Sequence, residues 1–312
     1  MSEQIKVVAI VGPTASGKTG LAVRIAEAVR GEIVSVDSLQ VYRGMDIGSA
    51  KADAAQRSAV PHHLLDVAAL DEPLDARQFA DLAAAAIAEI HARGAVPLLV
   101  GGAGLWFRAL LEGLMPAPAA DRQVRERLER LVDAEGAPAL HARLTEVDPV
   151  AARRIHPNDR VRAIRALEVR ELTGRTISEL QRSHQEAAPP AVYSVLKLGV
   201  LWPRGALYAR IDARVLAMWE AGFVDEVRDL LAAGFGRDLR PMGALGYKHV
   251  CAALAGEISM EEAVTLTQRD TRRYAKRQLV WFNRDPEIVW VDGAQDTPEA
   301  LAVVRSHLGS PQ

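Results

Sequence analysis

A phosphate-binding loop close to the N-terminus constrains this chain more than any other feature of its sequence. Residues 12–19 read Gly-Pro-Thr-Ala-Ser-Gly-Lys-Thr and fit the P-loop pattern. The run from Ile5 to Val11 before them is apolar and rich in β-branched residues, as in a strand buried on both faces. The segment from Lys18 to Arg30 after them has helical spacing. This order of strand, loop and helix predicts an α/β protein with a parallel sheet.

The residue types of the loop suit the capture of a diphosphate. Glycines let backbone N–H groups point inward, and the N-terminus of the following helix adds a partial positive charge. Lys18 supplies a full positive charge, and the Thr19 hydroxyl group can hold Mg²⁺. We therefore expect the diphosphate-binding residues to be Gly12, Pro13, Thr14, Ala15, Ser16, Gly17, Lys18 and Thr19. The loop alone does not say whether the diphosphate belongs to ATP.

Alternating strand and helix patterns continue on both sides of a different central region. Strands are expected at Glu32–Val36 and Val96–Val100, with a helix at Arg77–Arg93 between them. Strand character returns at Tyr193–Leu201 and at Glu287–Val291. The rhythm indicates a sheet whose strands come from both ends of the chain.

The central region is predicted to be an insertion within the α/β core. A stretch rich in proline and alanine, Met115 to Ala120, leads into dense, arginine-rich helical sequence that ends before Pro189 and Pro190. The predicted fold is α/β, with a P-loop NTPase-like core, a parallel sheet flanked by helices, and an inserted all-helical domain. The core should span residues 1–118 and 190–312, and the insertion residues 119–189.

Composition excludes several classes of protein. With 49% hydrophobic and 25% charged residues and a formal net charge of −2, the 312-residue chain does not have the composition of a disordered protein. Cys251 is the only cysteine, which excludes an intramolecular disulfide and a multi-cysteine zinc or iron–sulfur site. No apolar segment approaches the roughly 20 residues that cross a bilayer. The N-terminus does not resemble a signal peptide, so we expect a cytoplasmic protein.

Two segments of this nearly neutral chain are basic. Arg122 to Arg182 holds 13 arginines against 10 acids, and Thr265 to Arg284 holds six basic residues against Asp270. Segments of this kind bind nucleic-acid phosphates, or they are solvated helix faces whose charges pair with one another. Charge alone leaves both interpretations open.

Asp37 is the candidate general base. In P-loop proteins that hydrolyse nucleotides, an acid usually ends a buried strand and helps to hold Mg²⁺, but the strand Val96–Val100 runs into Gly101 and Gly102. In this chain the acidic residue is Asp37, which follows the predicted strand Glu32–Val36. A carboxylate at the carboxyl end of a strand beside the P-loop can accept a proton from a group bound opposite the phosphates. Alternatively, Asp37 caps the turn that it begins with Ser38.

Several further motifs occur in order along nearly the whole chain. They are residues 37–51 (Asp-Ser-Leu-Gln-Val-Tyr-Arg-Gly-Met-Asp-Ile-Gly-Ser-Ala-Lys), 62–66 (His-His-Leu-Leu-Asp), 101–106 (Gly-Gly-Ala-Gly-Leu-Trp) and 158–168 (Asn-Asp-Arg-Val-Arg-Ala-Ile-Arg-Ala-Leu-Glu). Together with the P-loop they resemble the bacterial tRNA dimethylallyltransferases, the IPP transferase family. The resemblance implies transfer of a dimethylallyl group from dimethylallyl diphosphate to the exocyclic amine of the adenosine just 3′ of the anticodon in tRNA, with release of diphosphate.

The resemblance also implies roles for individual residues. Asp37 would take the proton of the amine, while Lys18, Mg²⁺ at Thr19 and an arginine, Arg214 in preference to Arg210, would neutralise the departing diphosphate. The target base must leave its stack to reach the carboxylate. The residues implied to bind tRNA are Asp37, Ser38, Leu39, Gln40, Ala103, Arg125, Val161, Arg162, Ala163, Ile164 and Arg165. The expected partners are tRNA and dimethylallyl diphosphate, and the expected state is a monomer.

Some positions depart from the family or admit a second interpretation. The family usually has threonine and tyrosine where this chain has Ala103 and Trp106, so the hydroxyl at position 103 is lost while an aromatic side chain is kept at 106. Adjacent residues of an extended segment point to opposite sides, so His62 and His63 are expected to have structural or substrate-positioning roles rather than to form a metal pair. We expect core positions for three aromatic residues of the C-terminal part, Trp281, Phe282 and Trp290.

Two alternative functions use the same motifs. In a P-loop kinase for a small molecule or nucleoside, Asp37 would deprotonate a hydroxyl group and the insertion would be a lid. In a nucleotide-gated RNA-binding protein without chemistry, the basic insertion would matter and Asp37 would be incidental. The kinase predicts ATP-dependent phosphate transfer, whereas the prenyltransferase predicts alkylation of tRNA without ATP.

Overall fold

The computed structural model describes residues 4–187, 191–293 and 298–309, and the chain forms two compact units. The first unit comprises Met1–Leu111 and Ala191–Gln312, and the second is Glu112–Pro190. The sequence places these boundaries at 118/119 and 189/190; Pro189 and Pro190 lie outside the described residues. The first unit is therefore built from two separate stretches of chain, with the second unit between them in sequence.

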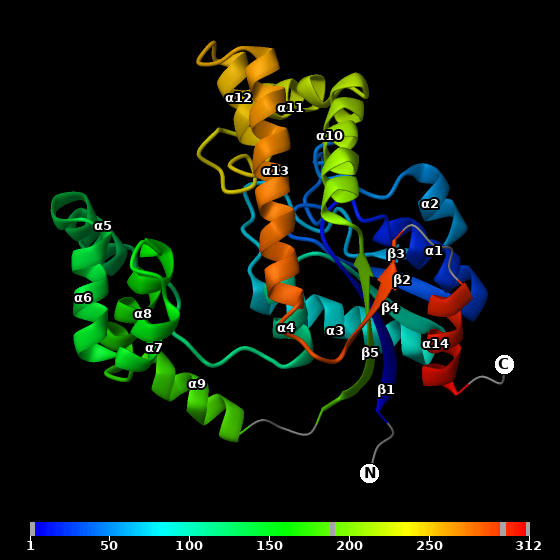
Figure 1. The fold of residues 1–312 in the computed structure, drawn as a ribbon, viewed down its shortest axis with the longest axis horizontal. Helices are drawn as coiled ribbons and strands as arrows, with labels where there is room; N and C mark the ends of the chain where they lie inside the picture. Colours follow the sequence, from blue (N-terminus) through cyan, green and yellow to red (C-terminus); the bar gives the residue numbers. More distant parts are fainter. Residues whose placement is uncertain (1–3, 188–190, 294–297, 310–312) are drawn as a thin grey trace. The chain divides into compact units, whose positions relative to one another are not determined.

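A six-stranded parallel sheet forms the centre of the first unit (Figure 1). The strands are β1 (Ile5–Val11), β2 (Gly31–Val36), β3 (His62–His63), β4 (Val96–Gly101), β5 (Tyr193–Leu201) and β6 (Ile288–Asp292), and their order is β3-β2-β4-β1-β5-β6. From Val7 to Ile10 the strand β1 is fully buried, because it has parallel neighbours on both sides and is covered on both faces. The predicted α/β fold with a parallel sheet is confirmed.

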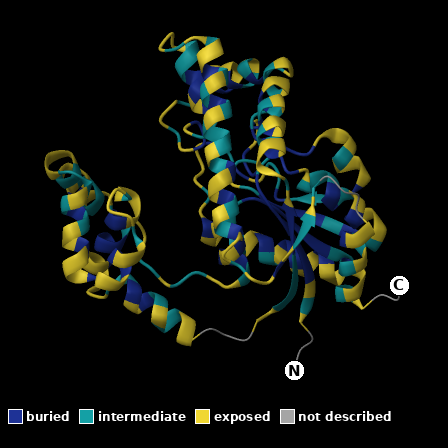
Figure 2. Cartoon of the chain, viewed as in Figure 1, coloured by how far each residue is buried: buried dark blue, intermediate teal, exposed yellow. Residues whose placement is uncertain are grey.

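Helices flank the sheet. Those of the first unit are α1 (Lys18–Val29), α2 (Ala54–Ala59), α3 (Ala76–Ala92), α4 (Gly104–Leu111), α10 (Arg204–Glu220), α11 (Phe223–Ala232), α12 (Tyr247–Leu254), α13 (Met260–Phe282) and α14 (Pro298–Leu308). Apolar residues of α1 and α14 pack against Val8 and Ile10 of β1, and α3 contacts β2 and β4. Figure 2 shows the resulting pattern, with buried strands between helices that are exposed on their outer faces.

Most of the predicted elements lie within one or two residues of the observed ones. Local signals explain this agreement: Asp75, for example, caps α3 by accepting N–H bonds from Arg77 and Gln78, and the Gln78 side chain accepts the N–H of Asp75 in return. The sequence analysis missed α2, β3, α4 and α12, which are too short to show a clear periodicity. No helix among the described residues is long and apolar enough to cross a membrane.

The second unit is helical throughout its described residues. Its helices are α5 (Arg122–Glu135), α6 (Ala137–Val147), α7 (Pro149–Arg154), α8 (Arg160–Thr173) and α9 (Ile177–Glu186). Leu128 of α5, Leu140 and Leu144 of α6, and Ile164 and Leu167 of α8 form its apolar core. The prediction of an inserted all-helical domain is confirmed.

A buried carboxylate ties the start of the second unit to α8. Glu168 has no exposed side-chain surface and accepts hydrogen bonds from the Asp121 N–H at 2.8 Å, from Arg125 Nε at 2.8 Å and from Arg165 Nη1 at 2.5 Å. Arg165 also donates to the Pro118 carbonyl at 2.7 Å. Removing one partner from such a group leaves a desolvated charge poorly satisfied, so these arginines stabilise the helical unit.

Glu168→Gln is expected to lower the free energy of unfolding of the second unit by roughly 1–3 kcal/mol, since charged hydrogen bonds become neutral and the new amide group faces the guanidinium groups. The matched control is Glu171→Gln in the same helix. Glu171 pairs with Arg127 at the surface, so its replacement should change stability by only about 0–1 kcal/mol. Hydrogen exchange of the α5 and α8 amides in the whole chain measures both effects.

The same exchange experiment should depend on pH. Burial raises the pKa of Glu168, but the hydrogen bonds from Arg125, Arg165 and Asp121 outweigh it and lower that pKa below 4.5. A carboxyl group with a lowered pKa stabilises the folded state while it is charged, so protection should fall as the pH drops below 4.5. The loss should be larger in the wild type than in Glu168→Gln, and an equal loss in both would contradict this role.

Candidate functional site

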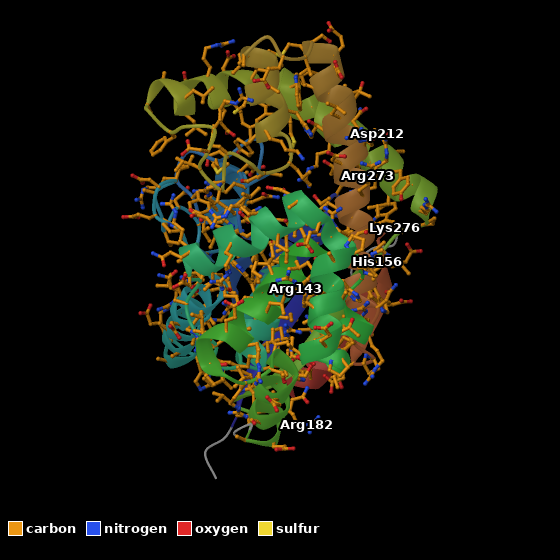
Figure 3. All side chains as sticks on the ribbon, turned by 90° about the vertical axis from the view of Figure 1, so that its left-hand side faces the viewer. Arg143, His156, Arg182, Asp212, Arg273 and Lys276 are labelled. Carbon is orange, nitrogen blue, oxygen red and sulfur yellow. The ribbon has the colours of Figure 1, made fainter. Side chains whose placement is uncertain are left out.

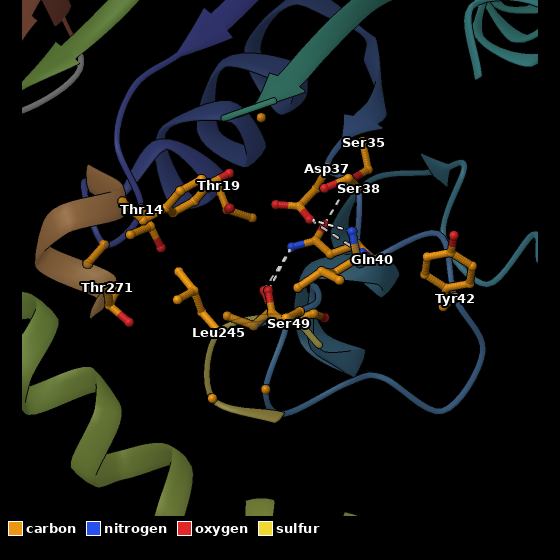
Figure 4. A pocket seen from close by; sticks show the side chains of 18 of the residues that line it. Thr14, Thr19, Ser35, Asp37, Ser38, Gln40, Tyr42, Ser49, Leu245 and Thr271 are labelled. Atoms are coloured by element: carbon orange, nitrogen blue, oxygen red, sulfur yellow. Dashed lines mark hydrogen bonds between the residues drawn. The ribbon is translucent and has the colours of Figure 1, made fainter. Parts of the chain in front are cut away.

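A cavity of about 410 Å³ lies at the carboxyl edge of the sheet, within the first unit. The P-loop and the start of α1 line one side, and the segment that follows β2 lines another. Figure 4 shows Thr14 and Thr271 on one side of the cavity and Asp37 and Gln40 on the other. Residues far apart in the sequence therefore surround one volume that suits a small anionic substrate together with an apolar group.

The P-loop contains three residues with positive φ angles. Gly12 and Gly17 have φ angles of 151° and 87°, values that favour glycine, and Ala15 at 62° accepts the left-handed region at some cost in energy. Two side chains hold the loop carbonyl groups outward: Arg210 Nε donates to the Ala15 carbonyl at 2.9 Å, and Trp202 Nε1 donates to the Ser16 carbonyl at 2.8 Å. The loop is thus arranged for an anion before one binds.

The two candidate arginines have different positions. Arg214 lines the cavity together with Lys18, Thr19 and Asp37. Arg210 lies behind the loop, where it stacks on the Trp202 ring at 4.3 Å. The arrangement favours Arg214 as the side chain that faces a bound diphosphate and gives Arg210 the role of holding the loop.

Lys18 and Arg214 are cations in a largely desolvated place. Burial lowers the pKa of Lys18 to about 8; the positive charge of Arg214 acts in the same direction, and Asp37 opposes both. Burial likewise lowers the pKa of Arg214, again opposed by Asp37. Because burial disfavours the charged forms of both side chains, a bound anion would stabilise them.

Asp37 forms the capped turn that its sequence allowed, and it also lies in the cavity. Its Oδ1 accepts the N–H of Leu39 at 2.9 Å and that of Gln40 at 3.4 Å, which is the geometry of a capped turn. The carboxylate also lines the cavity, where it faces the side of Thr19 (Figure 4). Among the described residues the hydrogen bonds of this carboxylate engage Oδ1, so Oδ2 is available to a substrate.

The segment after Asp37 is braced from within. Gln40 accepts from Ser35 Oγ at 2.8 Å and donates to the carbonyl groups of Ser49 and Ala50 at 3.3 and 3.1 Å. Its polar atoms are therefore occupied in shaping the wall of the cavity. Ser38 and Leu39 line the same wall, with Ser38 exposed.

The other residues that were expected to contact tRNA differ in how far they are buried. In the first unit, Ala103 is half-buried beside α4, whereas Trp106 is buried and stacks on Phe79 at 4.2 Å while lining the cavity. The aromatic surface expected at position 106 is therefore part of the core that closes the cavity. Of the aromatic residues expected in the core, Phe282 is buried, and Trp281 and Trp290 are half-buried.

In the second unit, the candidate segment at the start of α8 divides into exposed and buried residues. Val161 and Arg162 are exposed, while Ala163 and Ile164 belong to the apolar core. Arg162 pairs with Asp159 at 3.1 Å, and Arg125 and Arg165 hold Glu168. These arginines therefore form ion pairs with neighbouring acids, which is the alternative to phosphate binding that the sequence left open. Figure 3 shows two further arginines that are exposed on this unit, Arg143 and Arg182.

Sequence reasoning missed several residues of the cavity. One face of α13 carries Thr267, Thr271, Tyr274 and Gln278, all of which line the cavity. Their spacing places them on one side of the helix, where a core helix would be apolar, and this polar stripe is a signal that the sequence offers. The loop from Arg240 to Gly246, rich in glycine, also contributes.

Glu226 was missed as well, and it fixes another part of the wall. Its carboxylate accepts the N–H groups of Asp46, Ile47 and Gly48 at 3.0, 2.6 and 3.2 Å and the Tyr247 hydroxyl at 2.7 Å. These contacts join α11 and α12 to the segment that follows Gln40. Nothing in the local sequence around Glu226 indicates partners so far away.

Metal binding at this site would depend on the substrate. No group of three or more histidine, cysteine, aspartate or glutamate side chains able to hold a metal occurs among the described residues. His63 bonds to Glu32 at 2.6 Å and His62 to the Val60 carbonyl at 2.9 Å, so the two histidines do not form a pair. The Thr19 hydroxyl group in the cavity fits Mg²⁺, which prefers oxygen ligands and accepts phosphate oxygens and waters for the rest.

Comparisons with known proteins agree with this geometry. The model of the family described as "IPP transferase" matches residues 40–285. The chain is 54% identical to a tRNA dimethylallyltransferase of Geobacter sulfurreducens, with 92% of each chain covered, and 50% identical to one from Geotalea uraniireducens, with 98% and 97% covered.

Solved structures of two transferases are also similar to this chain. The crystal structure of a tRNA isopentenylpyrophosphate transferase from Bacillus halodurans has a TM-score of 0.70 and 41% identity, covering 97% of this chain and 95% of that one. A eukaryotic dimethylallyltransferase acting on tRNA has a TM-score of 0.78 and 25% identity, covering 98% and 80%.

The lowered pKa of Lys18 predicts how diphosphate binding varies with pH. Lys18 binds the anion in its charged form, which predominates below pH 8 and is lost above it. Affinity for inorganic diphosphate should therefore fall by up to about tenfold for each pH unit above that value. In Lys18→Arg the charge persists, because arginine stays protonated.

Calorimetric titration of both proteins from about pH 7 to about pH 9.5 provides the measurement. The ligand's own titration is common to the two, so the ratio of their dissociation constants isolates Lys18. That ratio should change with pH in favour of Lys18→Arg. A ratio that stays constant would show that Lys18 does not titrate in this range.

Proposed function

The chain belongs to the IPP transferase family, and we propose that its cavity transfers a dimethylallyl group from dimethylallyl diphosphate to the exocyclic amine of the adenosine 3′ of the anticodon in tRNA. The observation that carries this proposal is the presence of the P-loop, two half-buried cations and the Asp37 carboxylate around one cavity. Family membership does not favour the alternative of a P-loop kinase.

The donor end of the cavity is the P-loop side. The inward N–H groups and the N-terminus of α1 would bind the diphosphate, with Lys18 and Arg214 beside it. When the bond between the prenyl carbon and the diphosphate oxygen breaks, negative charge develops on that oxygen. Fixed cations in a desolvated site stabilise this charge better than water does, and they need no rearrangement at that moment.

The acceptor end contains Asp37. The adenine amine nitrogen would attack the prenyl carbon, and the proton that it loses would pass to the Asp37 carboxylate, giving the alkylated base and free diphosphate. An adenine stacked in the anticodon loop cannot reach a carboxylate in this cavity, so the base would have to be extruded from its stack. The turn held by Asp37 Oδ1 keeps the carboxylate in place.

Thr19 would hold Mg²⁺ together with the diphosphate oxygens. The ion would supply further neutralisation of the leaving group. The chain's own contribution is the hydroxyl group at the start of α1, on the side of the cavity that faces Asp37.

The tRNA would be held by exposed basic side chains. Arg162 of α8, and Arg273 and Lys276 of α13, which are also exposed (Figure 3), can reach phosphates. Arg125 and Arg165 would act mainly through Glu168, by giving the helical unit its shape. We also propose that the protein works as a monomer in the cytoplasm.

Asp37→Asn tests the general base with the least disturbance, because the amide oxygen can still accept the Leu39 N–H. Transfer should slow by about 10² to 10⁴, while the affinity for tRNA stays within about threefold, since one contact among many is altered. Single-turnover transfer and filter binding with unmodified tRNA measure the two quantities.

The matched control is Asp53→Asn, at the exposed N-cap of α2. Asparagine caps helices as well as aspartate, so this variant should transfer at the wild-type rate. An Asp37→Asn protein that also transfers at that rate would remove Asp37 from the reaction.

A further inference from the structure

Gln278 connects α13 to both edges of the phosphate site. It is 6% exposed, its Oε1 accepts the N–H of Thr14 in the P-loop at 2.8 Å, and its Nε2 donates to the carbonyl of Gly102 after β4 at 3.1 Å. A buried amide with a donor bond at one end and an acceptor bond at the other is held in one orientation. Gln278 is therefore a fixed part of the cavity wall.

The backbone at Gly102 approaches Gln278 closely. A Cβ atom at Gly102 would lie 2.1 Å from Gln278 Nε2, so glycine at 102 makes room for the amide. The residue lines the cavity beside Thr14 and Lys18. The contact between Gln278 and the P-loop therefore belongs to the packed interior of the first unit and not to its surface.

The N–H that Gln278 occupies has a particular place in the loop. Pro13 has no N–H, so Thr14 carries the first donor after Gly12, at the end of the loop farthest from α1. In P-loops that bind nucleoside triphosphates, the lysine reaches toward the outer phosphates. Here Lys18 Nζ donates to the Pro13 carbonyl at 3.1 Å, next to Thr14 in the sequence. By this analogy, an outermost, third phosphate would be bound near the Thr14 N–H.

We propose that Gln278 determines the specificity of the P-loop by closing it after two phosphates. With Gln278 in place, the Thr14 N–H is not free to bind a phosphate oxygen, and the partly negative Oε1 repels one. The Ser16 N–H donates to the Pro13 carbonyl at 3.3 Å, and the N–H groups of Ala15 and of residues 17–19 at the N-terminus of α1 remain for a diphosphate. This inference rests on the proposed function, since it explains how a motif common in ATP-binding proteins accepts a prenyl diphosphate instead.

A purely structural role makes a different prediction. If Gln278 served only to attach α13 to the loop and to β4, its removal would weaken the binding of all phosphates alike or lower the stability of the fold. Specificity for phosphate number is measured by a ratio of dissociation constants, which such a general effect does not change.

The test measures the binding of inorganic diphosphate and inorganic triphosphate to the whole chain by calorimetry, at a fixed Mg²⁺ concentration. Gln278→Met keeps the volume and removes both hydrogen bonds, and Gln278→Ala opens the site further. Gln268→Ala is the matched control, because Gln268 lies on α13 and donates to the Asp212 carbonyl at 3.3 Å, away from the P-loop.

The wild type should bind triphosphate at least about tenfold more weakly than diphosphate. In both Gln278 variants that ratio should shift by about tenfold or more in favour of triphosphate, the effect of one hydrogen bond to a charged group. Gln268→Ala should keep the wild-type ratio. An unchanged ratio in both Gln278 variants, or equal affinity of the wild type for the two anions, would overturn the inference alone. A wild type that binds neither anion would overturn the proposed function as well.

Discussion

The placement of two cations in one desolvated cavity is the constraint on which the rest of the site depends. Lys18 and Arg214 come from α1 and α10, and each is unfavourable where it lies unless an anion joins them. Asp37 relieves part of this strain with a single charge. A bound diphosphate would supply further negative charge beside both cations, and in the proposed reaction it is also the leaving group.

The parallel sheet makes this arrangement possible. The carboxyl ends of β1, β2 and β4 lie at one edge, so the P-loop, Asp37 and Gly102 meet although they are separated in the sequence. Helix α13 then covers this edge with a polar face, and Gln278 joins it to both the loop and β4. The P-loop and Asp37 therefore line opposite sides of one cavity, as the proposed transfer between two bound groups requires.

The sequence indicated those features that depend on neighbouring residues. The P-loop, the buried strands and Asp37 follow from local patterns, as do the boundaries of α1 and α3. It could not indicate contacts across long separations: Gln278 with Thr14, Glu226 with Gly48, or Arg125 with Glu168. The number of charges in the insertion does not distinguish one arginine from another. In the structure, Arg125 pairs with the buried Glu168, whereas Arg162 is exposed.

The central claim is that this P-loop binds a prenyl diphosphate for transfer to RNA. The most direct measurement incubates the whole chain with unmodified tRNA and Mg²⁺, in one reaction with dimethylallyl diphosphate labelled in the prenyl group and in another with ATP labelled in the γ-phosphate. We expect the prenyl label to enter the tRNA at the adenosine 3′ of the anticodon, in the absence of ATP, and no γ-phosphate to be released or transferred. Tight binding of ATP with release or transfer of its γ-phosphate, and no prenyl label in the tRNA, would contradict it.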